Sequence, residues 1–219
     1  MSRPTSWWWI RHAPVKGAEG RLTGQRDVEC DTSDERSFRA LAAMLPGDAI
    51  PIISSLKRTR QTFEAITVAG ACMPEPVVEP DLAEQSFGRW EGLSWVEMQA
   101  RDPDAYAAFW ENPTRNAPPG GESFTAQMRR TAAAIERLNT EFAGRDILSV
   151  SHGGTIRAAV AHALGLHPEA AMAIVIDNLS LTRLSLVHDR MLSPGRATWL
   201  VQGVNIPCQS LGGSEPLLP

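Results

Sequence analysis

Short apolar segments alternate with longer segments of helical period along most of this chain. The apolar segments lie at residues 7–10, 49–53 and 146–150. Segments with the periodicity of a helix follow at residues 33–45, 56–69, 123–142 and 153–165. Strands and helices that alternate in this way form a largely parallel sheet with helices on both faces. The pattern therefore predicts an α/β fold, a three-layer α/β/α sandwich with a mostly parallel sheet.

Two stretches depart from this alternation. Between residues 74 and 121 tryptophans and prolines are scattered without a clean strand, which predicts a small helical insertion at about 92–120. Such an insertion is expected to lie over the sheet as a lid. Residues 203–219 are rich in Gly, Pro and Ser and are expected to form a loose tail. We expect one domain, residues 1–219, with late strands at 173–176, 179–187 and 198–201.

Composition narrows the classes of partner. The chain has 219 residues and a formal net charge of -4, which gives no electrostatic footprint for nucleic acid. An anionic partner must then be a small molecule that meets a local basic pocket. Three scattered cysteines predict no disulfide framework, and the apolar run 7–10 is too short to span a membrane. These features indicate a cytoplasmic protein without nucleic-acid or membrane partners.

Basic side chains follow three of the predicted strands. Arg11 and His12 come directly after the first strand, Arg58 lies a few residues past the second, and His152 follows the strand that ends at Val150. Because ligands bind outside the carboxyl ends of strands in open α/β sheets, these side chains are expected to converge. Two guanidinium groups and two imidazoles around one point suit a phosphate group.

Each of these residues also has a simpler interpretation. An Arg-His dipeptide is common at strand ends, and a run such as Lys57–Arg60 is usually a solvated helix face. His152 precedes two glycines, which is typical of a tight turn from strand to helix. Their occurrence together, in this order and each at a strand end, favours a shared anion site.

Four segments of the chain resemble the motifs of a known family, the histidine phosphatase superfamily, which includes phosphoglycerate mutase-like proteins. The segments are residues 9–12 (WIRH), 54–62 (SSLKRTRQT), 82–92 (LAEQSFGRWEG) and 151–154 (SHGG). The loop at residues 118–123 is similar to that of α-ribazole phosphatase-type members. The resemblance implies that His12 is the nucleophile, that Arg11, Arg58 and His152 bind phosphate, and that Glu84 donates the proton.

The loop after His12 departs from the family pattern. Its sequence, Ala13-Pro14-Val15-Lys16-Gly17-Ala18, lacks the usual polar side chains, which leaves Lys16 or main-chain amides to contact the substrate. The small-residue turn at Thr23 and Gly24 is retained and is expected to line the pocket, as are the amides that begin with Gly153. Among the other acidic residues, Glu91 is interpreted as a structural carboxylate and Glu122 as part of a helix start.

The expected function is metal-independent hydrolysis of a phosphomonoester through a phosphohistidine, without a cofactor. The substrate is expected to be a small phosphorylated metabolite, with α-ribazole 5'-phosphate as one candidate. Two alternatives stay open: phosphoryl transfer of the phosphoglycerate mutase type, and a catalytically silent phosphate-binding protein. A metallohydrolase is disfavoured because His162, His167 and His188 lack metal-binding spacing. The oligomeric state stays open, a homodimer being one option.

Overall fold

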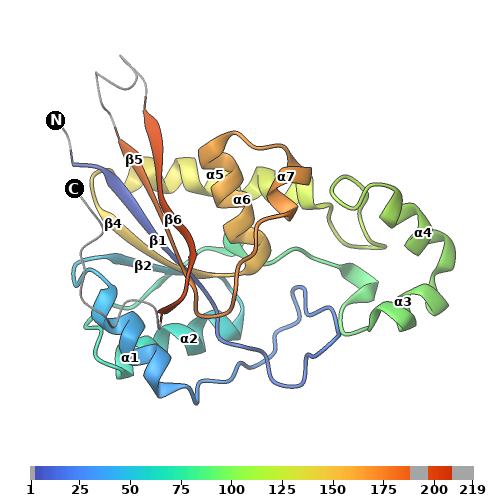
Figure 1. Cartoon of the computed structure of the whole chain (residues 1–219), viewed down its shortest axis with the longest axis horizontal. Coiled ribbons are helices and arrows are strands. Elements are labelled where there is room, and N and C mark those ends of the chain that lie inside the picture. Colours follow the sequence, from blue (N-terminus) through green and yellow to red (C-terminus); the bar gives the residue numbers. More distant parts are fainter. Residues whose placement is uncertain (1–2, 188–196, 209–219) are drawn as a thin grey trace.

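A six-stranded sheet forms the centre of the protein (Figure 1). The computed structural model describes residues 3–187 and 197–208. In sheet order the strands are β3 (Val77–Val78), β2 (Ile50–Ile53), β4 (Asp146–Ser151), β1 (Thr5–Arg11), β5 (Leu181–Val187) and β6 (Thr198–Ile206). The pairs β3–β2, β2–β4 and β4–β1 are parallel, whereas β5 runs antiparallel to both of its neighbours. The predicted mostly parallel α/β sheet is confirmed.

Helices cover both faces of this sheet (Figure 1). Helices α1 (Glu35–Met44) and α2 (Lys57–Val68) pack on one face, and α5 (Phe124–Glu141) and α6 (Gly153–Leu164) pack on the other. The alternation of side chains along β1 explains the two layers. Trp7 and Trp9 stack with ring centroids 4.7 Å apart on the face of α5 and α6, while Trp8 and Ile10 join the core under α1 and α2.

The helical insertion extends away from the sheet and not over it, so that part of the expectation is wrong (Figure 1). The 3₁₀ turns η1 (Pro80–Leu82) and η2 (Gly88–Trp90) precede it, and it contains the helices α3 (Trp95–Arg101) and α4 (Pro103–Glu111). Trp90, Met98 and Phe109 are buried together as a small core of its own. The loop at residues 21–22 is tied to it, because Leu22 exchanges main-chain hydrogen bonds with Gly92 and Leu93 and Arg21 pairs with Glu97.

Two expectations about the C-terminal third are wrong. Residues 203–206 do not belong to a loose tail but end β6, because they pair with β5 and Ile206 packs on the core under α1. Residues 173–176 form no strand and instead follow helix α7 (Pro168–Met172). Their carbonyls are satisfied by arginines: Arg157 Nε donates to Ile174 O and Arg11 Nη1 to Ile176 O.

Other details of the prediction need smaller changes. The stretch expected to lack strands contains the two-residue β3, which pairs with β2 at the sheet edge. The rest of the expected tail, 209–219, and His188 lie outside the described residues. In the described part of the chain, no helix is both long and apolar enough to cross a membrane.

Candidate active site

The basic residues expected at the strand ends do meet at one edge of the sheet. Arg11 is the last residue of β1, His152 follows β4, and Arg58 lies in the first turn of α2 after β2. The rings of His12 and His152 lie 5.1 Å apart between centroids, and Arg58 Nε lies 3.2 Å from His12 Nε2. A pocket of about 420 Å³ opens beside them, and Arg11, His12, Arg58 and Glu84 all line it.

The geometry of His12 fixes which ring nitrogen can react. Nδ1 lies 2.7 Å from the carbonyl oxygen of Ala13, and because a carbonyl only accepts, Nδ1 carries the hydrogen. Nε2 is then an unprotonated acceptor, and Arg58 Nε donates to it. Burial and, after it, the charge of Arg58 lower the pKa of His12 to about 3. His12 is therefore a neutral imidazole with a lone pair at Nε2.

The main chain around His12 is held on both sides. Its amide donates to Ser151 O at 2.9 Å, which ties the end of β1 to β4. Its carbonyl accepts from Asn178 Nδ2 at 2.7 Å, and Asn178 also lines the pocket. Sequence analysis missed Asn178, because no motif surrounds it and the apolar run before it resembled a strand.

Arg58 is buried and Arg11 is partly buried, and main-chain carbonyls anchor both. Arg58 donates through Nη2 to Gly24 O at 2.7 Å and through Nη1 to Arg26 O at 2.9 Å. Arg11 donates through Nη1 to Ile176 O, while its buried Nε has no partner among the described residues. Burial lowers the pKa of both groups, yet guanidinium groups stay charged in proteins. Fixed cations of this kind suit an oxyanion.

His152 lies behind the pocket and is completely buried. Its Nε2 contacts Ser54 Oγ at 2.8 Å, and its Nδ1 is a buried nitrogen without a partner in the described part of the chain. Burial, followed by the charge of Arg58, holds the pKa of His152 well below 6.5, so the ring is neutral. One ring nitrogen thus contacts a hydroxyl of the protein and the other has no partner among the described residues, while His152 itself is not among the residues that line the pocket.

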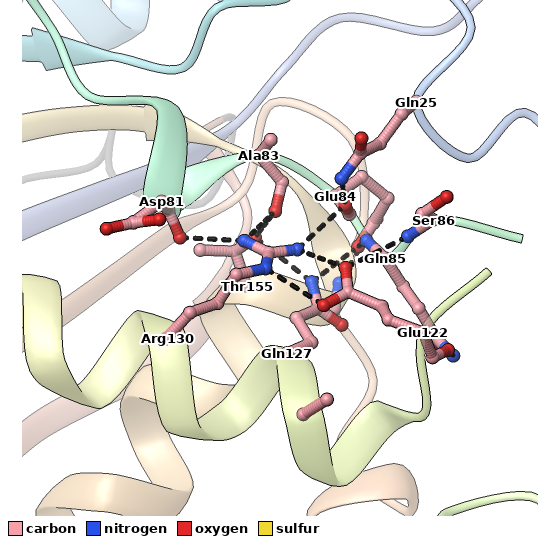
Figure 2. A network of polar contacts seen from close by, with 12 residues as sticks. Gln25, Asp81, Ala83, Glu84, Gln85, Ser86, Glu122, Gln127, Arg130 and Thr155 are labelled. Carbon is pink, nitrogen blue, oxygen red and sulfur yellow. Dashed lines mark hydrogen bonds and ion pairs between the residues drawn. The ribbon is translucent and has the colours of Figure 1, made fainter. Parts of the chain in front are cut away.

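Glu84 sits in a network of polar contacts between the insertion and helices α5 and α6 (Figure 2). Its Oε1 accepts from Gln127 Nε2 and from the amide of Gln85, each at 3.0 Å. Its Oε2 accepts from the amide of Gly154, in the first turn of α6, at 3.2 Å. Three donors therefore hold the carboxylate at the pocket wall.

Arg130 fixes the main chain that carries Glu84 (Figure 2). Its guanidinium donates to the carbonyls of Asp81, Ala83 and Glu84 and pairs with Glu122 at 2.6 Å. Glu122 directly precedes the start of α5, as expected, but its carboxylate does not cap the helix: it binds Arg130 and the amide of Ser86. The side chain that caps α5 is Ser123.

The four residues expected to contact substrate divide into two groups. Thr23 and Gly24 line the pocket, and the Gly24 carbonyl also holds Arg58. Gly153 packs under Arg11, with an ideal Cβ 3.5 Å from Arg11 Nε, and Lys16 is not among the residues that line the pocket. Glu91 accepts from the amides of Gln25 and Phe87, as expected of a structural carboxylate.

One phenylalanine lines the pocket. It is Phe87, whereas Trp90 belongs to the small core of the insertion. Trp95 and Trp110 lie against each other on the surface of the insertion, with ring centroids 5.6 Å apart. Sequence analysis missed Phe87 because only the acidic residues of the segment 82–92 were interpreted.

Comparison with known proteins finds relatives of this chain in sequence. A metal-independent phosphoserine phosphatase of Arabidopsis thaliana is 33% identical over 155 residues, which are 68% of this chain and 64% of that protein. A bifunctional protein of Mycobacterium tuberculosis is 32% identical over 82% of this chain and 50% of its own length. The chain thus spans about half to two thirds of the length of these curated relatives.

Solved structures share the fold over nearly the whole chain. The α-ribazole phosphatase of Shigella flexneri has a TM-score of 0.78 at 21% identity, over 92% of this chain and 96% of that one. A mycobacterial glucosyl-3-phosphoglycerate phosphatase in complex with VO3 has a TM-score of 0.74 at 26% identity, over 92% and 99%. The sequence model of the histidine phosphatase superfamily, branch 1, matches residues 7–193. This chain belongs to the histidine phosphatase superfamily.

Proposed function

We propose that this protein hydrolyses phosphomonoesters of small metabolites through a phosphohistidine on His12, without a metal. One observation carries the proposal: the neutral His12, whose Nε2 is unprotonated and accepts from Arg58 Nε, lines a pocket together with Arg11, Arg58 and Glu84. A neutral imidazole is a competent nucleophile toward phosphorus. The described residues contain no cluster of three or more His, Cys, Asp or Glu side chains that could hold a metal ion.

In the first step, His12 Nε2 forms a bond to phosphorus while the bond from phosphorus to the ester oxygen breaks. The leaving oxygen takes a proton from Glu84. Arg58 Nε, which donates to Nε2 in the free protein, transfers its hydrogen bond to a phosphoryl oxygen and frees the lone pair. The Ala13 carbonyl, which accepts from Nδ1, stabilises the positive charge that develops on the ring.

In the second step, a water oxygen forms a bond to phosphorus while the bond from phosphorus to Nε2 breaks. Glu84 now acts as a base and takes a proton from the water, so that inorganic phosphate leaves and the enzyme is restored. Arg11 and Arg58 stabilise charge on the phosphoryl oxygens in both steps, and most of the catalysis comes from this positioning and electrostatics.

The substrate proposal is a small phosphorylated metabolite. A pocket of about 420 Å³ suits a ligand of that size, and Val15, Leu22 and Phe87 give its wall an apolar side. Phosphoserine and α-ribazole 5'-phosphate are the candidates, since phosphatases with these names are relatives in sequence and in fold respectively.

A rapid-quench experiment tests the proposal. Labelled phenyl phosphate is mixed with enzyme in the presence of excess chelator and quenched in alkali, which preserves phosphohistidine. We expect an acid-labile adduct on the peptide that contains His12, its decay to free phosphate at a rate consistent with turnover, and its absence in His12→Ala.

Three other outcomes would contradict parts of the proposal. An adduct discharged only by added 3-phosphoglycerate would indicate a mutase, and no adduct under any condition would indicate a silent phosphate-binding protein. Turnover that is lost with chelator and restored by one divalent ion would show that a metal takes part.

A further inference from the structure

Helix α5 places a buried glutamine against the carboxylate of Glu84 (Figure 2). Gln127 is completely buried, and its Nε2 donates to Glu84 Oε1 at 3.0 Å and to Thr155 Oγ1 at 3.3 Å. The family resemblance assigns no role to this position.

The orientation of this amide is fixed by its surroundings. The Thr155 hydroxyl has a single hydrogen, which it donates to the main-chain carbonyl of Ala83 or Leu82 at 3.0 or 3.2 Å. Thr155 Oγ1 can then only accept from Gln127, so the side that faces Thr155 and Glu84 must be the NH2 group. A reversed amide would place its oxygen against two acceptors.

The two oxygens of Glu84 are held unequally as a result. Oε1 accepts two hydrogen bonds, from Gln127 Nε2 and from the amide of Gln85, whereas Oε2 accepts one longer bond from the amide of Gly154. An oxygen whose lone pairs are both engaged by N–H donors is a poor place for a proton. The proton of the carboxylic acid therefore belongs on Oε2.

We propose that Gln127 is a positioning residue that keeps Glu84 Oε1 as the accepting oxygen and so directs the catalytic proton to Oε2. This inference rests on the proposed function of Glu84 as general acid and base. In the first step the proton leaves Oε2 for the ester oxygen, and in the second step Oε2 receives a proton from water. The same amide donates to Oε1 in both states, so the carboxylate need not rotate between steps.

The side chain of Gln127 lowers the stability of the folded protein through one of its atoms. Its Oε1 is buried and has no hydrogen-bond partner among the described residues, and a buried acceptor left unpaired is unfavourable. A methionine has nearly the same length and no such oxygen. We therefore expect Gln127→Met to fold with a melting temperature equal to or above that of the wild type.

The test compares two aryl esters that differ in their need for an acid. Phenyl phosphate has a poor leaving group, and 4-nitrophenyl phosphate has a good one. We expect Gln127→Met to raise the ratio of kcat for 4-nitrophenyl phosphate to kcat for phenyl phosphate by about tenfold or more, with KM changed by less than about twofold. Gln127→Leu is a second variant with the same expectation, should the first fail to fold.

Gln85 provides a matched control. It is also a buried glutamine beside Glu84, but its side-chain amide donates to Glu122 O. Its contact with the Glu84 carboxylate is made by its backbone amide, which a substitution of the side chain retains. Gln85→Met should keep the ratio of the two kcat values within about twofold of the wild type. On a Glu84→Gln background, Gln127→Met should have no further effect on that ratio.

The outcomes separate this proposal from the one on which it rests. An unchanged ratio in Gln127→Met and Gln127→Leu, or an equal change in Gln85→Met, would overturn the role of Gln127 while leaving phosphohistidine formation intact. A wild-type protein that forms no adduct on His12 would overturn the proposed function, and this inference with it.

Discussion

Arg58 uses every nitrogen of its side chain. Nε donates to the reactive nitrogen of His12, and the two terminal nitrogens donate to the carbonyls of Arg26 and Gly24. A planar fork with donors in three directions can hold its position against the backbone and still face an anion. Lysine has one compact ammonium group and can satisfy only part of this arrangement.

We therefore expect Arg58→Lys to lower kcat/KM for 4-nitrophenyl phosphate by about 100-fold, or about 2.7 kcal/mol of transition-state stabilisation. Arg60→Lys is the matched control, because Arg60 lies two residues farther along α2 and forms a surface ion pair with Glu75. Steady-state kinetics of both variants test whether the guanidinium group of Arg58 is required. A loss of less than about threefold in Arg58→Lys would show that charge alone is sufficient there.

At the scale of elements, a glycine in the first turn of α6, Gly154, leaves space for the side chains of Glu84 and Gln127. A Cβ built on Gly154 would lie well inside van der Waals contact of Glu84 Oε1 and 2.7 Å from Gln127 Oε1. Gly154 has no left-handed backbone angle, and alanine is the better helix former, so the helix itself accepts the change. The side chains of Glu84 and Gln127 would have to move.

For Gly154→Ala we expect a folded protein whose kcat on phenyl phosphate falls about tenfold more than its kcat on 4-nitrophenyl phosphate. Gly47→Ala is the control, since a Cβ on Gly47 meets nothing within 4 Å. Circular dichroism melting checks the fold of both variants. Equal losses on the two esters would mean that the displaced carboxylate is not the general acid.

The strand ends could be predicted from sequence because their signals are local. Each apolar run ends at polar residues that mark the end of a strand, and parallel strands share one edge, so the basic residues at or shortly after these ends, Arg11, Arg58 and His152, are predicted to meet. Gln127 and Asn178 could not be found in this way. Their partners, Glu84 and His12, are distant in sequence, and only the packing of α5 and of the loop before β5 brings them close.

Tertiary contacts also overrode local patterns in the C-terminal third. The apolar run 173–176 has the composition of a strand, but two arginine side chains satisfy carbonyls at Ile174 and Ile176, and the segment stays irregular. Residues 203–206 have the composition of a loop and nevertheless extend β6, since β5 offers them a free edge. Burial and pairing, rather than propensity, decided both segments.

At the scale of the whole molecule, folding places two neutral histidines beside the buried Arg58 and the partly buried Arg11, although the chain has a net charge of -4. Burial is the first cause of the lowered pKa of both His12 and His152, and Arg58 is the second. In the unfolded chain both side chains would titrate near 6.5. Acid must therefore favour the unfolded state, because there both histidines bind a proton that they do not bind in the folded protein.

Proton linkage gives the sign of this pH dependence and the pH range in which it occurs. Between pH 6.5 and about 3, the unfolded chain carries a proton on His12 that the folded protein lacks, so the free energy of unfolding falls as the pH falls. His152 adds to the slope in the same direction. Near pH 5.5 each histidine should contribute about 1.2 kcal/mol per pH unit. The contribution should become nearly constant above about pH 7.5, where the unfolded chain has lost these protons too.

Urea unfolding of the wild type, His12→Asn and His152→Asn at pH 7.5, 6.5, 6.0 and 5.5 tests this, because Asn does not titrate. Between pH 6.0 and 5.5 the free energy of unfolding of each variant should depend less steeply on pH than that of the wild type, by the contribution of about one proton. This holds whatever the stability of the variant at pH 7.5. A slope in His12→Asn equal to that of the wild type would mean that His12 takes up its proton in the folded state. Its Nε2 would then be protonated at mildly acidic pH and could not attack phosphorus, so the activity would fall in that pH range.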